Sequence, residues 1–189
     1  MQLNFLGAYM IELLAVLSAS AAVGIRIALP VLFFGLLQGQ QLWSEVPVLS
    51  NISSSFLLGI LTSWSVIELT ASKKLMGQRI LQIVEILFSP VMGAIMGLAV
   101  VAATQAPTWL IGITGGLFAL VLQLVQLGWF FRLRGLPLWF VFIQDALCIA
   151  LVLFAFGAPT PGGLIALLLL WFAIYSGKLW YDWYREKKS

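Results

Sequence analysis

Six long runs of apolar residues divide the chain, separated by short polar connections. A membrane-spanning helix needs ~20 mostly apolar residues, because the hydrocarbon layer is ~30 Å thick and each helical residue adds about 1.5 Å. The runs cover about Tyr9–Leu37, Ser53–Thr70, Pro90–Ala103, Thr108–Phe131, Leu136–Phe156 and Gly163–Tyr181. The pattern predicts an all-α fold: a polytopic membrane helix bundle with six transmembrane segments, forming a single integral membrane domain over residues 1–189.

Two of the six runs carry signs of irregular helices. The first is too long for one straight crossing, and Gly24 and Pro30 within it predict a broken helix. The third is short unless the amphipathic stretch Arg79–Phe88 joins it through a kink at Pro90. Proline lacks a backbone donor and bends a helix, but membrane helices tolerate it where neighbours satisfy the freed groups.

Basic residues alternate from one connection to the next, which gives an independent prediction of topology. Lys and Arg occur in residues 71–89, in the turn with Arg132 and Arg134, and in the C-terminal tail, but not in residues 38–51, 105–107 or 157–162. Basic loops stay in the cytoplasm because translocating them is unfavourable. Six crossings would then place both termini in the cytoplasm.

Composition narrows the function classes. The chain is 62% hydrophobic and 9% charged, whereas soluble domains are ~45–50% apolar and ~25% charged. The absence of histidine and the single Cys148 exclude histidine catalysis, zinc–histidine sites and intrachain disulfides, so we expect no enzyme, metal or cofactor. The net charge of +3 comes from short basic loops, which suit anionic lipid headgroups and not nucleic acid.

Arg26 is the most informative residue, because it lies near the bilayer centre inside the first apolar run. A central arginine costs ~2.5–3.5 kcal/mol on insertion scales, so it needs a partner. Asp145 lies at a similar depth in the fifth run, and we predict that the two side chains form a buried charge pair. A functional arginine and a structural one that binds the free carbonyls of a broken helix are equally consistent with the sequence.

Other polar residues near the helix ends give weaker signals. Glu68 could reach Lys73, and Glu85 lies on the polar side of the amphipathic stretch; both are expected to be solvated or paired at the interface. Gln144 is next to Asp145 on a different helix face, and Gln123 and Gln126 in the fourth run are expected to form hydrogen bonds between helices.

Small residues predict where helices pack closely. Gly93 and Gly97 form a GxxxG motif in the third run, and Gly112 and Gly116 form another in the fourth. The short turn between these runs makes them antiparallel neighbours, so the motifs favour packing within one chain over dimerisation.

These landmarks resemble one known family. Gly24-Ile25-Arg26 with Pro30, Glu68 before a loop, Ser89-Pro90, and Gln144-Asp145 resemble small membrane proteins catalogued as domain of unknown function 4126. The chain departs from the family pattern at Ser72-Lys73-Lys74, where an acidic loop is expected, and at Gln144, where the family has an acid. The resemblance implies a six-helix domain in a bacterial plasma membrane or a plastid thylakoid, and it brings no established activity.

Two functions remain open from the sequence. The buried charges and the helix break favour transport or permeation of a small solute or ion. Short loops and little extramembranous mass equally fit a non-catalytic subunit or scaffold, either as a homo-oligomer or in a larger membrane complex.

Overall fold

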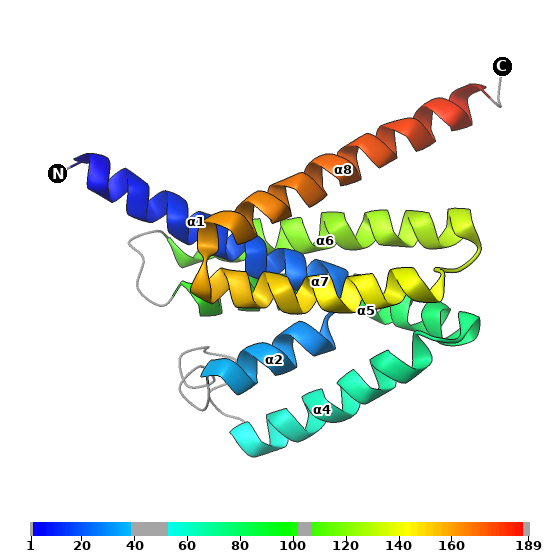
Figure 1. Ribbon diagram of the computed structural model, residues 1–189, viewed down its shortest axis with the longest axis horizontal. Coiled ribbons are helices and arrows are strands. Elements are labelled where there is room, and N and C mark those ends of the chain that lie inside the picture. The colour runs from blue at the N-terminus through cyan, green and yellow to red at the C-terminus, as the bar shows by residue number, and fades with distance from the viewer. Residues whose placement is uncertain (1, 39–52, 102–106, 187–189) are drawn as a thin grey trace.

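The computed structural model describes residues 2–38, 53–101 and 107–186, which form helices and no strands. In chain order the helices are α1 (Gln2–Ile25), α2 (Ala28–Gln38), α4 (Ser54–Ala71), α5 (Leu75–Val100), α6 (Thr108–Leu133), α7 (Leu138–Gly157) and α8 (Pro159–Glu186). They lie lengthwise beside one another (Figure 1). The all-α prediction is confirmed. The basic-free connection at 38–51 and the turn at 105–107 fall almost entirely outside the described residues.

Four helices, α5 to α8, are long and apolar enough to cross a membrane. Their outer surfaces carry large apolar side chains, among them Ile83 and Leu87 at 68% exposed and Trp171 at 64%. Such a surface is unfavourable in water and favourable against lipid chains. Shorter apolar helices cover Tyr9–Ile25, Ala28–Leu37 and Leu58–Ala71. The architecture is that of a membrane helix bundle.

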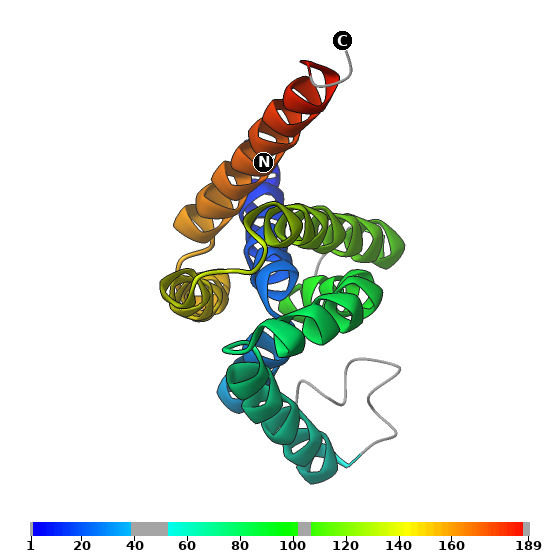
Figure 2. The same ribbon diagram turned by 90° about the vertical axis from the view of Figure 1, so that its right-hand side faces the viewer.

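Helix α1 occupies the middle of the bundle. Seen end-on, it is surrounded by α5, α6, α7 and α8, while α4 lies at the edge beside α2 (Figure 2). Small buried side chains line α1, including Ala19, Ala21, Ala22 and Val23. Small residues let neighbouring backbones approach closely, which is how membrane helices gain packing contacts.

Helix α1 runs antiparallel to α7. The Ser18 hydroxyl donates a hydrogen bond to the Leu151 carbonyl at 2.7 Å. Further along α1, just past its end, Arg26 contacts Asp145, which precedes Leu151 in α7. As the residue number rises along α1, the contacted residue number falls along α7.

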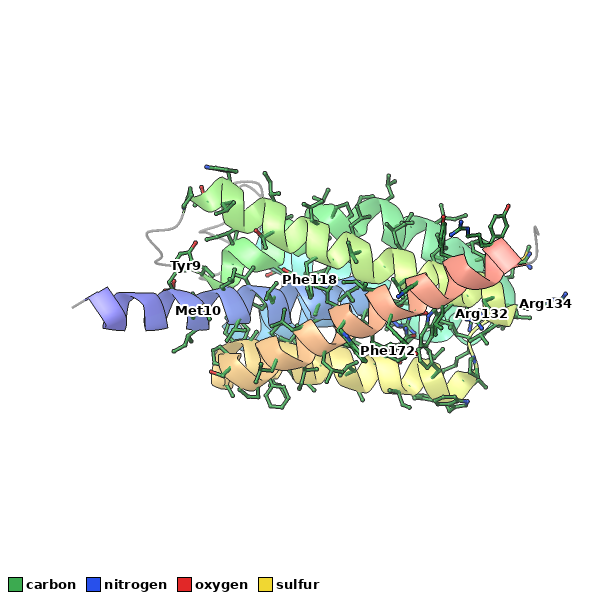
Figure 3. All side chains as sticks on the ribbon, turned by 90° about the horizontal axis from the view of Figure 1, so that it is seen from above. Tyr9, Met10, Phe118, Arg132, Arg134 and Phe172 are labelled. Carbon is green, nitrogen blue, oxygen red and sulfur yellow. The ribbon has the colours of Figure 1, made fainter. Side chains whose placement is uncertain are left out.

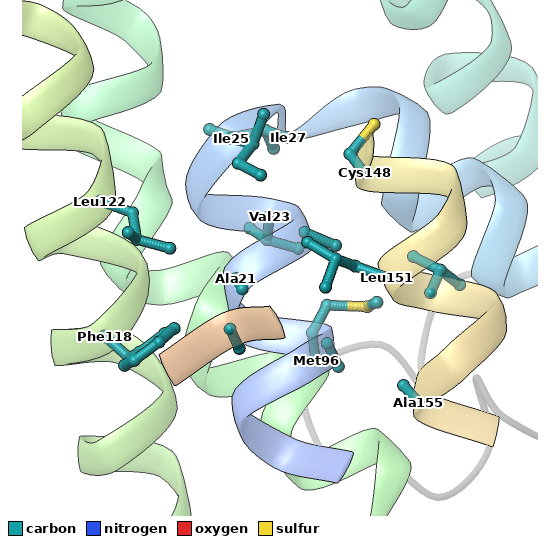
Figure 4. Close-up of a cluster of buried hydrophobic side chains, with 14 of the residues drawn as sticks. Ala21, Val23, Ile25, Ile27, Met96, Phe118, Leu122, Cys148, Leu151 and Ala155 are labelled. Carbon is teal, nitrogen blue, oxygen red and sulfur yellow. The ribbon is translucent and has the colours of Figure 1, made fainter. Parts of the chain in front are cut away.

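Helix α2 runs in the opposite direction to α1. Phe34 near the end of α2 lies against Phe156 near the end of α7, with ring centroids 4.7 Å apart. Because α2 is parallel to α7, the chain reverses at Arg26-Ile27, as the path from Ile25 to Ile27 shows in Figure 4. The predicted break is therefore a helical hairpin: the first apolar run turns back on itself, whereas the six-segment prediction treats it as one crossing.

The reversal changes the positions of the termini. Figure 1 places the start of α1 and the end of α8 at opposite ends of the bundle, whereas the pattern of basic loops predicts both on one side. The basic residues at the connections still gather at one end: Lys73 and Lys74 lie between α4 and α5, and Arg132 and Arg134 lie where α6 ends (Figure 3).

Helix α5 joins the amphipathic stretch to the third apolar run and continues through Pro90 as one helix. Its polar face points inward, contrary to the expectation that it meets water. The buried residues at helical spacing on this face are Gln78, Gln82, Glu85 and Ser89. Ile80, Ile83 and Leu87 on the other face are exposed. An inverted pattern of this kind is favourable in lipid, where the apolar face is the one that meets solvent.

Helices α5 and α6 approach closely at three glycines. A Cβ atom on Gly93 would lie 2.5 Å from the Ala119 Cβ, and one on Gly115 would lie 2.6 Å from the Gly93 carbonyl oxygen. A Cβ atom on Gly116 would lie 2.6 Å from the Pro90 oxygen. Any larger residue at these positions would force the backbones apart.

The other two motif glycines have more space. A Cβ atom on Gly97 would lie 3.2 Å from a Val16 methyl group, and one on Gly112 would be in ordinary contact with Leu98 at 3.8 Å. The GxxxG spacing predicts close packing at Gly112, but in the structure Gly115, next to Gly116, makes the close contact instead.

Candidate functional site

The reversal between α1 and α2 leaves two helix ends inside the bundle, and side chains from other helices bind both. At the end of α1, the Gln126 Nε2 donates a hydrogen bond to the Gly24 carbonyl oxygen at 3.1 Å. At the start of α2, the Ala28 N–H donates to the Glu68 Oε2 at 3.0 Å. A carboxylate at a helix N-terminus also interacts favourably with the helix dipole. Two long-range hydrogen bonds therefore hold the hairpin.

The two residues named as the helix break have different roles in the structure. Gly24 lies inside α1, where a Cβ atom would be 2.9 Å from the backbone of Ala119, so its role is close packing against α6. Pro30 lies in the first turn of α2, where a missing N–H leaves no intrahelical bond unmade. The break falls between them, at Arg26-Ile27.

Arg26 lies at the tip of the hairpin and contacts two carboxylates. Its Nε is 3.1 Å from the Asp145 Oδ1, and its Nη1 is 3.7 Å from the Glu68 Oε1. The side chains of Arg26, Glu68 and Asp145 are 6%, 2% and 14% exposed. The structure brings together the pair that the sequence analysis predicts and adds Glu68 as a second partner.

The burial of Glu68 corrects the expectation that it is solvated or paired with Lys73. Helix α4 packs against α2, and the last turns of α4 bring Glu68 to the Ala28 N–H. Lys73, two residues beyond the end of α4, is exposed. The sequence signal for this burial is weak, because only the reversal of the first segment brings Arg26 to the end of α4.

Glu85 is likewise buried, which corrects the second expectation of a solvated acid. It lies on the inward face of α5, and its Oε2 accepts a hydrogen bond from the Gln123 Nε2 at 2.9 Å. The charged groups that act on its carboxyl group are Glu68 and Arg26. Three carboxyl groups and one guanidinium thus share the centre of the bundle.

A chain of amides connects α7 to the end of α1. The Gln144 Nε2 donates to the Gln126 Oε1 at 2.9 Å, and Gln126 in turn binds Gly24. Gln144 is buried, and it stands where the family pattern has an acid. A neutral amide here can donate as well as accept, so it orients Gln126 without adding another negative charge.

Gln78, which the sequence analysis did not single out, holds two turns together at the basic end of the bundle. Its Nε2 donates to the carbonyl oxygens of Ser72 and Leu136, at 2.8 and 3.1 Å. Its Oε1 accepts from the Leu136 N–H at 3.0 Å. The spacing of Gln78, Gln82 and Glu85 along α5 is the signal that could have revealed it.

Two cavities adjoin this polar centre. A polar cavity of ≈ 20 Å³ is lined by residues that include Arg26, Gln78, Gln82 and Glu85. A larger apolar cavity of ≈ 260 Å³ lies between α6, α7 and α8, and its lining includes Trp129 and Phe172. Gln126 and Gln144 are its two polar residues and separate it from the charged cluster. In the described residues, no group of three acids or cysteines is arranged to bind a metal ion.

Fold and site together define an integral membrane protein with a polar, charged centre inside a helix bundle. The family model described as "Domain of unknown function (DUF4126)" matches residues 13–178. The chain belongs to this family, as the resemblance in its sequence predicts. No curated protein matches the chain, and no solved structure does.

Proposed function

We propose that the protein moves a small ion or small polar solute across the membrane through its buried polar centre. The supporting observation is the chain reversal at Arg26-Ile27, which leaves two helix ends and a charge between packed helices. Discontinuous helices with charges at mid-depth form substrate sites in transporters. A structural arginine needs one counter-charge, whereas Arg26 contacts Glu68 and Asp145.

The membrane arrangement that we infer has five crossings, made by α4 to α8. The hairpin of α1 and α2 enters and leaves on one face, in the manner of a re-entrant segment buried in protein. Because the basic connections lie at one end of the bundle, the positive-inside rule places that end in the cytoplasm. The end of α8 is then cytoplasmic and the start of α1 is on the opposite face of a bacterial plasma membrane or a thylakoid.

The alternative is a non-catalytic subunit, a homo-oligomer or a scaffold of a larger membrane complex. Its support is the outward surface of α8, where the exposed rings of Trp171 and Tyr175 stack with centroids 5.6 Å apart. Aromatic rings of this kind are enriched at protein interfaces. An enzyme is not proposed, because the chain has no histidine and its single cysteine is buried.

Flux measurements in proteoliposomes test the transport proposal. Purified protein is reconstituted, and entry of sodium, potassium, chloride and protons is followed separately against protein-free liposomes. We expect flux of at least one ion that Arg26→Gln and Asp145→Asn abolish, because each removes one charge of the pair. Arg79→Gln, at an exposed position of α5, is the matched control and should retain the flux.

The opposite outcome is equally specific. If the wild-type protein shows no flux and native mass spectrometry after gentle extraction finds a stoichiometric partner, the subunit alternative replaces the transport proposal. Flux that both variants retain would mean that the ions do not pass through the site around Arg26.

A further inference from the structure

The buried centre contains more acids than bases. Arg26 is in ion-pair contact with Glu68 and Asp145, but the described residues place no basic group in such contact with Glu85. An isolated carboxylate away from water costs several kcal/mol, and a buried excess of like charge adds to that cost. The buried cluster therefore requires a further positive charge beside that of Arg26.

The size of the polar cavity beside Glu85 limits which cation can supply that charge. At ≈ 20 Å³ the cavity has room for about one water molecule and none for a hydrated ion or an organic solute. Gln82, which is 5% exposed, lines this cavity, and its Oε1 has no hydrogen-bond partner among the described residues. A water molecule there would have the Gln82 amide and the Glu85 carboxyl group as partners.

The cavity extends toward the basic end of the bundle. Its lining includes Ser72 and Gln78, and Gln78 joins the α4–α5 turn to the α6–α7 turn. Glu85 therefore lines the same cavity as residues at the turns of the basic end. The lining toward the apolar cavity consists of the neutral amides of Gln126 and Gln144, which neither add nor remove charge.

We propose that Glu85 binds a proton, and that this proton exchanges with the basic end of the bundle through a water in the polar cavity. The proposal deepens the proposed function, because it names the proton as the ion that the site takes. On binding, a proton that reaches the cavity water from the basic end leaves that water and forms an O–H bond with the Glu85 carboxylate, so the water is neutral again; release is the reverse step, and no electron is transferred.

The charged and titratable groups around Glu85 come from several packed elements. They are Arg26 at the α1–α2 reversal and Glu68 on α4, while Asp145 on α7 is the second partner of Arg26; α6 contributes the neutral Gln123. With Glu85 protonated, Glu68 and Asp145 carry two negative charges and Arg26, which contacts both, carries one positive charge. One excess negative charge then remains. The Gln123 amide can accept from the new O–H through its Oε1, which is otherwise without a partner.

Infrared difference spectroscopy on the full-length protein in nanodiscs tests proton binding directly. At neutral pH we expect a protonated-carboxyl band that shifts in D₂O and disappears in Glu85→Gln. Glu12→Gln, which changes a half-buried acid of α1, is the control and should retain the band. If Glu85→Gln fails to fold, Gln82→Leu supplies the second test, because a dry cavity should slow H/D exchange of the band.

Each possible result decides the proposal. A wild-type spectrum without the band at neutral pH, a band that persists in Glu85→Gln, or exchange unchanged in Gln82→Leu would overturn proton binding at Glu85. A band that sodium chloride removes at constant pH would assign the site to sodium instead. A Glu85 band without flux of any of the four ions in proteoliposomes would keep the proton site and refute transport, whereas flux without the band would keep transport and refute the proton site.

Discussion

At the residue scale, the close-packed glycines and the polar network depend on atoms placed within a few tenths of an ångström. The contact between α5 and α6 places Gly115 against the carbonyl oxygen of Gly93 and the hydroxyl of Ser20, which itself donates to that carbonyl. Gly112, three residues earlier on the same helix, has only ordinary contacts. The two glycines form a matched pair for mutation.

We predict that Gly115→Ala destabilises the protein by about 1–3 kcal/mol, as overpacking of a buried contact does, whereas Gly112→Ala has little effect. Thermal unfolding in detergent, followed by tryptophan fluorescence, measures both. Equal losses of stability in the two variants would contradict the close approach at Gly115.

Some residues of the candidate site could be predicted from the sequence and others could not. Arg26 and Asp145 could be paired because each is costly in lipid and their depths match along two apolar runs. Glu68 and Glu85 could not be placed correctly, since distance from a helix end says nothing about which face is buried. Their burial follows from the hairpin and from the inverted face of α5.

At the scale of elements, the hairpin of α1 and α2 is the feature on which the candidate site depends. If the first run continued straight across, Phe34 would approach the start of α7, because α1 is antiparallel to α7. In the hairpin, Phe34 instead lies against Phe156 at the end of α7. These two arrangements place the same residue at opposite ends of one helix.

Cysteine cross-linking separates the two arrangements. In a Cys148→Ser background, we predict that a short bifunctional thiol reagent links Phe34→Cys to Phe156→Cys efficiently, and does not link Phe34→Cys to Leu138→Cys. Band shifts on denaturing gels measure the yield. Preferential linkage to position 138 would restore the straight crossing and remove the hairpin.

The same comparison should be insensitive to Pro30→Ala. Pro30 lies where a helix needs no N–H donor, and the reversal is held by Gln126 and Glu68. The sequence correctly predicts an irregular first segment from its length, but proline and glycine do not indicate whether a helix bends or turns back.

At the scale of the whole molecule, the proposed five crossings predict which face of the membrane the start of α1 and the end of α8 occupy. With α4 to α8 as the crossings, an odd number of spans separates the start of α1 from the end of α8. Gly7 near the start of α1 and Lys74 between α4 and α5 are both exposed. The start of α1 and the α4–α5 connection lie at opposite ends of the bundle (Figure 1). They are suitable positions for accessibility labels.

We predict that, in intact cells producing the Cys148→Ser protein, a membrane-impermeant maleimide labels Gly7→Cys without permeabilisation. Lys74→Cys should be labelled only after the membrane is opened, because the positive-inside rule predicts that the basic end is cytoplasmic. Mass shift of the purified protein measures both reactions. The same accessibility at the two positions would place both on one face, as six crossings require.

The sequence by itself determined that this protein belongs in lipid, that it is helical and which family it resembles. Long apolar runs and basic loops carry this information because each is a local feature of the chain. It also indicated which residues are too polar to face lipid. Only the tertiary structure decided that the first run folds back, that α5 turns its polar face inward, and that Glu68 and Glu85 join Arg26. Those outcomes depend on contacts between segments far apart in the chain, where the spacing of residues along one helix carries no information.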